Sequence, residues 1–334
     1  MVNHQVPPTL AGWHTRHSGT AGLDVSDFVM VDEPLARPEE GEIVVRTGWL
    51  SLDPYLSFAM IGSGDGGGTW PVQGRIIGEV VQSRAAQVPV GSMVLATGRW
   101  RTWNVLRAAE VEVLAADPRW PTTVYFGALG ASGLTAWVGM TLAAVQPGET
   151  ILISAATGPV GSVCGQLARE RGARVLGIAG GEDKCRLAVS RYGYDVCLDH
   201  RLLGLSERLS AAASAGINVL FENVGAPSLD PALHSMVAGG RVVLCGLAAH
   251  YRNGDPIALT NFRLILRKQL SIQGFAWTEH QDLHQAGRAW LAERLAAGTL
   301  AYDETVSTGL SLAAEAYVAM LAGKGLGKHV VELP

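Results

Sequence analysis

Two different rhythms of apolar and polar positions divide the chain. In the first part, short apolar runs alternate with turn residues, a pattern that predicts a β domain of the barrel or sandwich kind. The clearest runs are Glu42–Arg46, Arg75–Val81 and Ser92–Ala96. The segment Gly62–Gly68 has no strand pattern and holds five glycines in seven residues, so we expect a mobile loop there.

From about Thr150 the rhythm changes to alternating strands and helices. The first strand, Thr150–Ser154, is almost continuously apolar, as a strand buried on both faces of a parallel sheet requires. Helical spacing follows over Pro159–Arg171. Five further strands are predicted at Arg174–Ala179, Asp195–Asp199, Asn218–Glu222, Arg241–Cys245 and Leu270–Phe275. Six strands that alternate with helices predict an α/β fold with a doubly wound parallel sheet of the Rossmann type.

Beyond about Leu300 the pattern becomes mixed and ends in a strand-like run, His329–Leu333. This run could rejoin the β domain, which would make the Rossmann domain an insertion between two parts of it. We therefore predict three segments. The β domain begins in 1–125, the Rossmann domain covers 126–297, and the returning tail covers 298–334.

Composition limits the function classes. The 334 residues carry 26 Lys and Arg against 30 Asp and Glu, a net charge of −4, and 48% are hydrophobic. This excludes a disordered chain, and the charge balance gives no electrostatic hold on nucleic acid or an anionic membrane. The most apolar stretch, Leu129–Val145, is interrupted by glycines and too short to span a membrane. The four cysteines all follow residue 163 and are too sparse for a disulfide framework, so we expect a cytoplasmic protein.

A glycine turn follows the first strand of the α/β part. Ala155–Gly161 aligns with the dinucleotide pattern G-x-G-x-x-G, with alanine in place of the first glycine. Gly158 would let the backbone approach a pyrophosphate, and Gly161 would let the helix pack close to the sheet. Pro159 suits a first helical turn, and with Val160 it would bring the helix N-terminus to the phosphates. The turn predicts a dinucleotide site; a glycine turn that only packs a helix onto a sheet is the alternative.

The end of the second strand bears on the choice of cofactor. An NAD site usually places an acidic residue there, but this chain has two glycines, beginning at Gly180, which leave room for a bulkier group. Lys184 can offer charge to a 2′-phosphate. His200 and Arg201, after the third strand, can add a ring and a second charge. Although Glu182 could bind the ribose of NAD, these residues favour NADPH.

Metal ligands are sparse in this sequence. A zinc site needs three or four protein ligands, yet the first 163 residues contain no cysteine. His14 and His17 have pair spacing, as do His280 and His284, but neither pair has a third ligand nearby. We expect surface histidines and no metal. Without a Lewis acid, an isolated ketone is hard to reduce, whereas an activated C=C bond needs only hydride delivery and enolate stabilisation.

Six blocks of sequence carry a family resemblance: Ser51–Leu56, Leu129–Trp137, Ala155–Gly161, Gly180–Cys185, Phe221–Gly225 and Cys245–Tyr251. Together they resemble the zinc-independent leukotriene B4 dehydrogenase and prostaglandin reductase family of the medium-chain dehydrogenase/reductase superfamily, which includes plant alkenal double-bond reductases and bacterial curcumin reductase. The resemblance covers nearly the whole chain. It implies a GroES-like N-terminal domain completed by the tail, NADPH as cofactor, an apolar unsaturated carbonyl as substrate, and a homodimer formed through the Rossmann domain.

The resemblance also implies roles for single residues. Lys184 matches the family's lysine for the 2′-phosphate, and Tyr251 matches a tyrosine near the nicotinamide ribose and the substrate carbonyl. Tyr55 matches a tyrosine of the substrate pocket. The catalytic candidates are therefore Tyr251 and Tyr55. The predicted cofactor contacts are Thr135, Gly158, Pro159, Val160, Gly161, Gly180, Lys184, His200, Asn223, Gly225, Cys245, Gly246 and Phe275.

Three departures from the family pattern stand out. The family usually has a tyrosine where His200 stands, and arginines where this chain has Ser57–Ala59. Its tail carries an asparagine that contacts the cofactor, and Gly325 occupies that position here. These changes bear on the strictness for NADPH and on the charge at the mouth of the substrate pocket.

The chemistry we expect is hydride transfer to the β-carbon of an enone or enal, with Tyr251 donating a hydrogen bond to the enolate oxygen. A reductive cyclase that acts on a polyenone is the alternative, because the same hydride step can lead to ring closure. Quinone reduction and a non-catalytic NADPH-binding protein are further alternatives. We expect no catalytic thiol, since free cysteines such as Cys185 and Cys245 are usually small buried hydrophobes.

Overall fold

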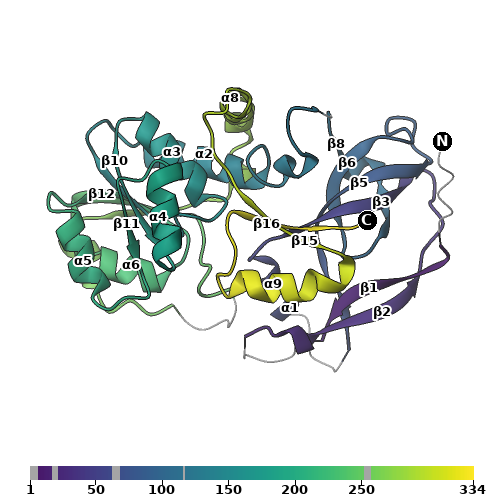
Figure 1. The fold of residues 1–334 in the computed structure, drawn as a ribbon, viewed down its shortest axis with the longest axis horizontal. Helices are drawn as coiled ribbons and strands as arrows, with labels where there is room; N and C mark the ends of the chain where they lie inside the picture. Colours follow the sequence, from purple (N-terminus) through teal and green to yellow (C-terminus); the bar gives the residue numbers. More distant parts are fainter. Residues whose placement is uncertain (1–6, 17–21, 62–67, 116, 252–256) are drawn as a thin grey trace.

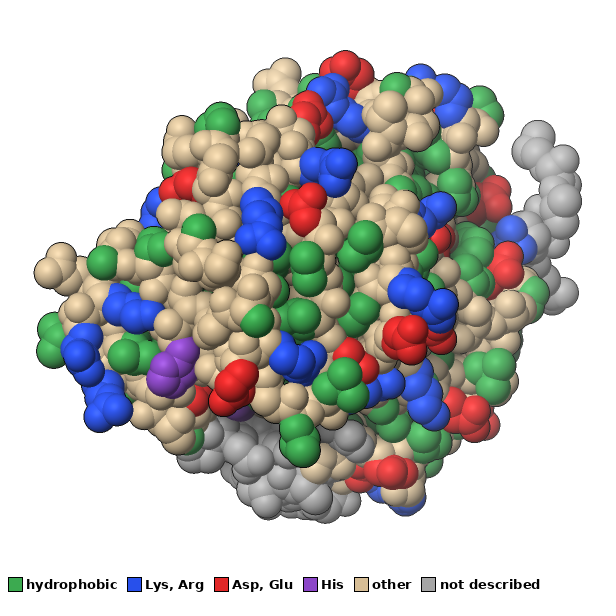
Figure 2. Space-filling model, turned by 60° about the vertical axis from the view of Figure 1, so that its left-hand side comes forward, with side chains coloured by type: hydrophobic (Ala, Val, Ile, Leu, Met, Phe, Trp, Pro, Cys, Tyr) green, Lys and Arg blue, Asp and Glu red, His purple; other side chains and the backbone are tan. Residues whose placement is uncertain are grey.

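The sheets of the two lobes lie at opposite ends of the molecule in the computed structural model, and the C-terminal segment runs between them (Figure 1). The structure describes residues 7–16, 22–61, 68–115, 117–251 and 257–334. Most of the predicted loop Gly62–Gly68 lies outside these ranges. Within them, no helix combines the length and the apolar character needed to cross a membrane. On the face drawn in Figure 2, basic and acidic side chains are interspersed.

The Rossmann lobe contains a six-stranded sheet whose paired strands are all parallel. Its order is β11-β10-β9-β12-β13-β14. The chain adds strands on one side of β9 up to β11 and then on the other side from β12 to β14, so the strand order reverses between β9 and β12. The strands are β9 (Thr150–Ile153), β10 (Arg174–Ala179), β11 (Val196–Asp199), β12 (Ile217–Glu222), β13 (Met236–Leu244) and β14 (Ser271–Gly274). The prediction of a doubly wound sheet is confirmed. Such sheets bind ligands outside the carboxyl ends of their strands, where the order reverses.

Helices connect these strands and cover the sheet (Figure 1). They are α2 (Ala131–Ala143), α3 (Gly161–Glu170), α4 (Glu182–Arg191), α5 (Leu205–Ala212), α6 (Ala226–Ala232), α7 (Arg263–Arg267) and α8 (His284–Ala296). One expectation was wrong in detail. Helix α3 begins at Gly161 rather than at Pro159, because residues 158–160 still belong to the turn that follows β9. Pro159 therefore lies in that turn and not in the first helical turn.

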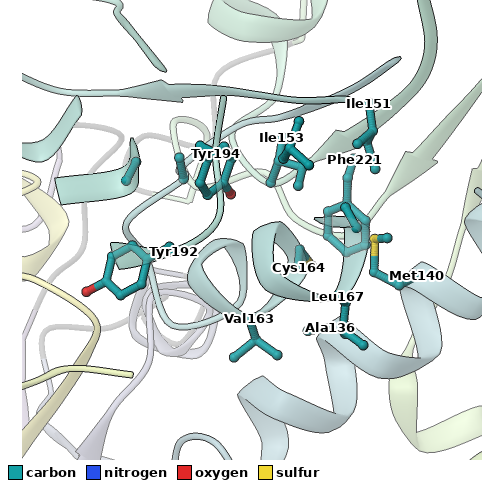
Figure 3. Packing of buried hydrophobic residues seen from close by; sticks show 14 of the residues in the cluster. Ala136, Met140, Ile151, Ile153, Val163, Cys164, Leu167, Tyr192, Tyr194 and Phe221 are labelled. Carbon is teal, nitrogen blue, oxygen red and sulfur yellow. The ribbon is translucent and has the colours of Figure 1, made fainter. Parts of the chain in front are cut away.

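The core under α3 holds the start of this helix in place (Figure 3). Ile151 and Ile153 of β9 and Phe221 of β12 are fully buried and belong to the same cluster as Cys164 and Leu167 of α3. Helix α3 packs directly against the sheet through these side chains, and their removal from water stabilises the lobe. The carboxyl ends of β9 and β12 and the beginning of α3 are thus fixed relative to one another.

The N-terminal lobe is built from two sheets, whose strands from the N-terminal part of the chain pair antiparallel. The smaller has the order β2-β1-β4, with β1 (Thr9–Thr15), β2 (Phe28–Pro34) and β4 (Trp70–Pro71). The larger contains β3 (Glu42–Leu52), β5 (Gln73–Ser83), β6 (Met93–Arg99), β7 (Trp103–Arg107) and β8 (Glu112–Val113). Two of the three predicted runs lie inside β3 and β5, and the third, Ser92–Ala96, begins one residue before β6, so the β-rich domain is confirmed. Helix α1 (Leu56–Ile61) follows β3.

The C-terminal segment completes the larger sheet. It contains β15 (Glu304–Thr308), α9 (Ala313–Leu321) and β16 (Lys328–Glu332). Strand β16 pairs in parallel with β15 and antiparallel with β3. The tail therefore returns to the N-terminal lobe as expected, while the exact boundaries at 125/126 and 297/298 remain a prediction.

Candidate active site

The turn that was predicted to bind the phosphates lies between β9 and α3. Ala155 has a positive φ of 50°, and the amide of Gly158 donates to its carbonyl oxygen at 2.9 Å. A Cβ atom at Gly161 would lie 2.3 Å from that same oxygen, so only glycine fits there without a shift of the backbone. The turn brings the start of α3 against the sheet, the arrangement in which helix N–H groups bind a pyrophosphate.

Basic side chains gather at the end of β10, where the ribose of a dinucleotide lies in this fold. A Cβ atom at Gly180 would lie 2.9 Å from Nε2 of His200, and one at Gly181 would lie 3.0 Å from Nη1 of Arg201. Burial lowers the pKa of Lys184, and the nearby Arg201 lowers it further. Burial is also the main cause that lowers the pKa of His200, so its ring is neutral at pH 7.

The acidic residue that could bind the ribose of NAD is placed differently from these basic side chains. Glu182 is exposed in the first turn of α4, whereas the side chains of His200 and Arg201 lie beside the glycine pair. A cluster of one imidazole, one ammonium and one guanidinium suits the doubly charged phosphate of a phosphorylated ribose.

The tail passes over both parts of this site. Lys184 donates through Nζ to the carbonyl oxygen of Gly323 at 2.7 Å, and the amide of Gly327 donates to Thr157 in the phosphate turn at 3.0 Å. Gly325 has a φ of +77°, and a Cβ atom there would lie 2.5 Å from Cε1 of His329. The buried His329 thus explains in steric terms why glycine stands at this position.

The loop after β12 carries the residues expected beside the nicotinamide. Asn223 donates through Nδ2 to the carbonyl oxygen of Ser154 at 2.7 Å, and its amide donates to the Ser154 hydroxyl at 2.7 Å. Gly225 has a φ of +102°, and a Cβ atom there would lie 2.5 Å from the His250 ring. The loop is therefore held against both β9 and the segment that precedes Tyr251.

Glu222 is a residue of this site to which the sequence analysis assigned no role. Its side chain is fully buried at the end of β12. Oε1 accepts hydrogen bonds of 2.6–2.8 Å from four donors, whereas Oε2 has no partner among the described residues. The donors are the hydroxyls of Ser154 and Ser228 and the amides of Val224 and Gly225. Burial raises the pKa of this carboxyl group. In the sequence, the feature that could have indicated Glu222 is a charged residue at the end of a mostly apolar strand.

Tyr251 lies over the turn that follows β13. Its hydroxyl oxygen accepts a hydrogen bond from the amide of Leu247 at 3.0 Å, and a Cβ atom at Gly246 would lie 3.3 Å from it. Burial raises the pKa of Tyr251, so the phenol keeps its proton at pH 7. Because the oxygen already serves as an acceptor, its proton is available for donation to a third group.

Tyr55, the second predicted catalytic residue, lies in the N-terminal lobe between β3 and α1. It is half exposed and follows Asp53, which comes directly after β3. Asp53 binds the ammonium of Lys328 at 2.5 Å, and that lysine is almost fully buried. No role for Lys328 could be predicted from the sequence, because its partner lies 275 residues away in the chain.

The other predicted cofactor residues are spread more widely. Thr135 is half buried on α2. Phe275 packs edge-on against Phe221, with ring centroids 6.3 Å apart, so packing accounts for its ring. Burial, together with Glu222, raises the pKa of Cys245 to about 12, which keeps this thiol protonated and unreactive.

One expectation about histidines was wrong. His14 is buried rather than on the surface, because β1 directs it inward, where Nε2 lies 3.3 Å from Glu33. His17 lies outside the described residues. Within the described ranges, no three His, Cys, Asp or Glu side chains are grouped so that they could hold a metal ion.

Comparisons with known proteins give relatives along nearly the whole chain. A family model described as zinc-binding dehydrogenase matches residues 159–293, and one described as the N-terminal domain of oxidoreductase matches residues 13–114. The chain is 31% identical over 328 residues to the NADPH-dependent curcumin reductase of Escherichia coli (strain K12), with 92% of each protein covered. It is also 31% identical over 315 residues to prostaglandin reductase 1 of Bos taurus, covering 92% of this chain and 94% of that protein. The crystal structure of CurA in complex with NADPH from Vibrio vulnificus matches with a TM-score of 0.88 at 30% identity, covering 98% of this chain and 99% of that one.

Proposed function

Since the chain belongs to the zinc-independent medium-chain dehydrogenase/reductase family that includes curcumin and prostaglandin reductases, we propose that it reduces the C=C bond of α,β-unsaturated carbonyl compounds. It is an NADPH-dependent oxidoreductase. The close glycine turn at Gly158 and Gly161 suits the pyrophosphate, and the basic cluster of Lys184, His200 and Arg201 suits the 2′-phosphate. When bound, NADPH supplies a hydride for the β-carbon of the substrate.

The protein's own contribution is to stabilise the negative charge that develops on the carbonyl oxygen. The observation that carries this role is the hydrogen bond from the Leu247 amide to the Tyr251 hydroxyl oxygen, which leaves the phenol proton free to donate. A preorganised donor of this kind stabilises an enolate in the transition state more than the neutral carbonyl in the ground state. Tyr55, half exposed at the start of α1, is proposed to contact the rest of the substrate.

The test is a screen of NADPH oxidation with enals, enones, quinones and polyenones, followed by product analysis. We expect saturation of benzalacetone and cinnamaldehyde. A new ring in the product would indicate a reductive cyclase, and turnover of quinones alone would indicate a quinone reductase. Binding of NADPH without turnover of any compound would contradict an enzymatic role.

Replacing Tyr251 by Phe removes the donor while keeping the ring. We expect kcat for benzalacetone to fall about 10²–10³-fold, the usual cost of losing an oxyanion donor. The dissociation constant for NADPH should stay near that of the wild type. Unchanged kcat/KM in this variant would contradict the role of Tyr251.

Replacing Lys184 by Ala tests the cofactor site. We expect KM for NADPH to rise about tenfold, since a charge-assisted hydrogen bond to phosphate contributes roughly 1.5–3 kcal/mol. KM for NADH should not change, because NADH has no 2′-phosphate. An equal rise for both cofactors would contradict this assignment.

The open edge of the Rossmann sheet supports a homodimer. All four residues of β14 are exposed, and Ile272 is 42% exposed. An exposed edge strand is a template for pairing with another chain, here a second copy of the protein in the cytoplasm. Light scattering after gel filtration tests this, and Ile272→Lys should shift the mass toward the monomer.

A further inference from the structure

We propose that Ser57 and Phe58 of the N-terminal lobe are positioning residues that clamp Tyr251 across the boundary between the lobes. The inference rests on the proposed role of Tyr251 in enone reduction. It gives a function to two residues of helix α1, which begins just after Tyr55.

Ser57 supplies the polar half of the clamp. Its side chain is fully buried, and its hydroxyl lies 2.7 Å from the carbonyl oxygen of Tyr251 and 2.8 Å from that of Pro54. The first of these contacts joins residues 194 positions apart. A buried hydroxyl is almost always hydrogen-bonded, and the single proton of Ser57 lies between these two carbonyl oxygens, so the hydroxyl links the backbone of the Rossmann loop to the start of α1.

Phe58 supplies the apolar half. Its ring meets that of Tyr251 edge-on, with centroids 4.8 Å apart and planes at 72°. Such aromatic pairs contribute stabilisation beyond the area that they bury. Phe58 remains 54% exposed, so its packing inside the N-terminal lobe is limited, and the tyrosine ring is its aromatic partner.

Tyr251 is therefore held at three points. Ser57 contacts its carbonyl oxygen, Phe58 contacts its ring, and the Leu247 amide donates to its hydroxyl. Two of these contacts come from the N-terminal lobe and one from the Rossmann lobe. The position of the phenol is thus set by both lobes together, and a fixed position is what a donor to a developing enolate requires.

A contact that only joins the lobes would have different consequences from a clamp on Tyr251. A general link between the lobes would affect stability and NADPH binding to the same extent whether or not the phenol of Tyr251 is present. A clamp should lower kcat at an unchanged NADPH dissociation constant, and its effect should vanish when the phenol is absent, because residues that act as a unit are not additive.

The experiment compares Ser57→Ala and Phe58→Leu in the wild-type and Tyr251→Phe backgrounds, with benzalacetone as substrate. In the wild-type background we expect kcat to fall about fivefold to tenfold for each variant. In the Tyr251→Phe background the further loss should be less than about twofold. Phe58→Tyr should restore kcat because it keeps the ring. Ser83→Ala and Val90→Ala, which change the same lobe far from Tyr251 in the chain, are the matched controls.

Equal losses in both backgrounds, or unchanged kcat in both single variants, would overturn the clamp. Hydrogen exchange tests the clamp on Tyr251 independently of any measurement of turnover. In Ser57→Ala and Phe58→Leu, the peptide spanning residues 245–251 should exchange faster than in wild type and in the controls. Unchanged exchange overturns the clamp even if an enone is reduced. If exchange is faster but no enone is reduced, the clamp stands and the proposed function fails.

Discussion

Two carboxylates, one in each lobe, are held at the end of a strand in opposite ways. Glu222 ends β12 of the Rossmann sheet and gives one oxygen to four uncharged donors. Asp53 follows β3 of the N-terminal lobe and binds the buried ammonium of Lys328 and the hydroxyl of Ser51. Glu222 thus fixes the turn that follows its strand, whereas Asp53 fixes the end of its strand against β16.

The difference appears in the pKa of the two groups. Burial raises the pKa of Glu222, and its neutral donors do not offset that effect. Burial also acts to raise the pKa of Asp53, but the Lys328 ammonium, together with the Ser51 hydroxyl and Arg75, outweighs it, so that the pKa lies below its ordinary value. The comparison teaches that the stability contributed by a buried ion pair depends on both partners. The stability contributed by a carboxyl group that is bound by neutral donors depends little on whether the group is charged.

The largest effect should come from Lys328→Met, which leaves the Asp53 carboxylate buried and unpaired. Breaking a buried ion pair from one side costs about 3–5 kcal/mol, and we expect the free energy of unfolding in urea to fall by this amount. The double variant Asp53→Asn with Lys328→Met should recover most of the loss. If it recovers none, charge pairing is not what holds this turn.

The next effect should come from Glu222→Ala, which leaves four buried donors without an acceptor. We expect a loss of about 2–4 kcal/mol in the free energy of unfolding, since each unsatisfied group is costly. Glu222→Gln should cost less than Glu222→Ala, because the amide oxygen keeps an acceptor at the position of Oε1. If Gln costs as much as Ala, the charge of Glu222 matters after all.

The smallest effect is on pH dependence. The folded pKa of Glu222 is raised, so its contribution to stability is present below the unfolded pKa of about 4.3 and is lost as the pH rises through the folded value. The stability of wild type relative to Glu222→Gln should therefore decline above about pH 4.3. For Asp53 the sign is opposite: its contribution is lost as the pH falls below about 3.9. Urea titrations at a series of pH values measure both, and a flat difference for Glu222 would contradict its raised pKa.

These residues also show how far the sequence can be interpreted. Gly158 and Gly161 act through neighbours a few residues away, so their pattern was enough to predict the turn, and the six apolar runs that alternate with helices were enough to predict the doubly wound sheet. The pairing of Asp53 with Lys328 depends on a register between distant strands, and no local pattern encodes it. His14 was misjudged for a related reason, since its burial follows from Glu33 on the neighbouring strand.

The return of β16 to β3 also sets an order of events during synthesis. Lys328 donates to the carbonyl oxygen of Leu52, which leaves the ribosome 276 residues earlier. At about 5–20 residues per second, this separation corresponds to roughly 14–55 s. Throughout that interval the edge of β3 at residues 49–52 lacks its partner, whereas the Rossmann sheet has its last strand, β14, at residue 274, 54 residues before Lys328. The N-terminal lobe, although synthesised first, is therefore expected to mature last and to depend on chaperones while it waits.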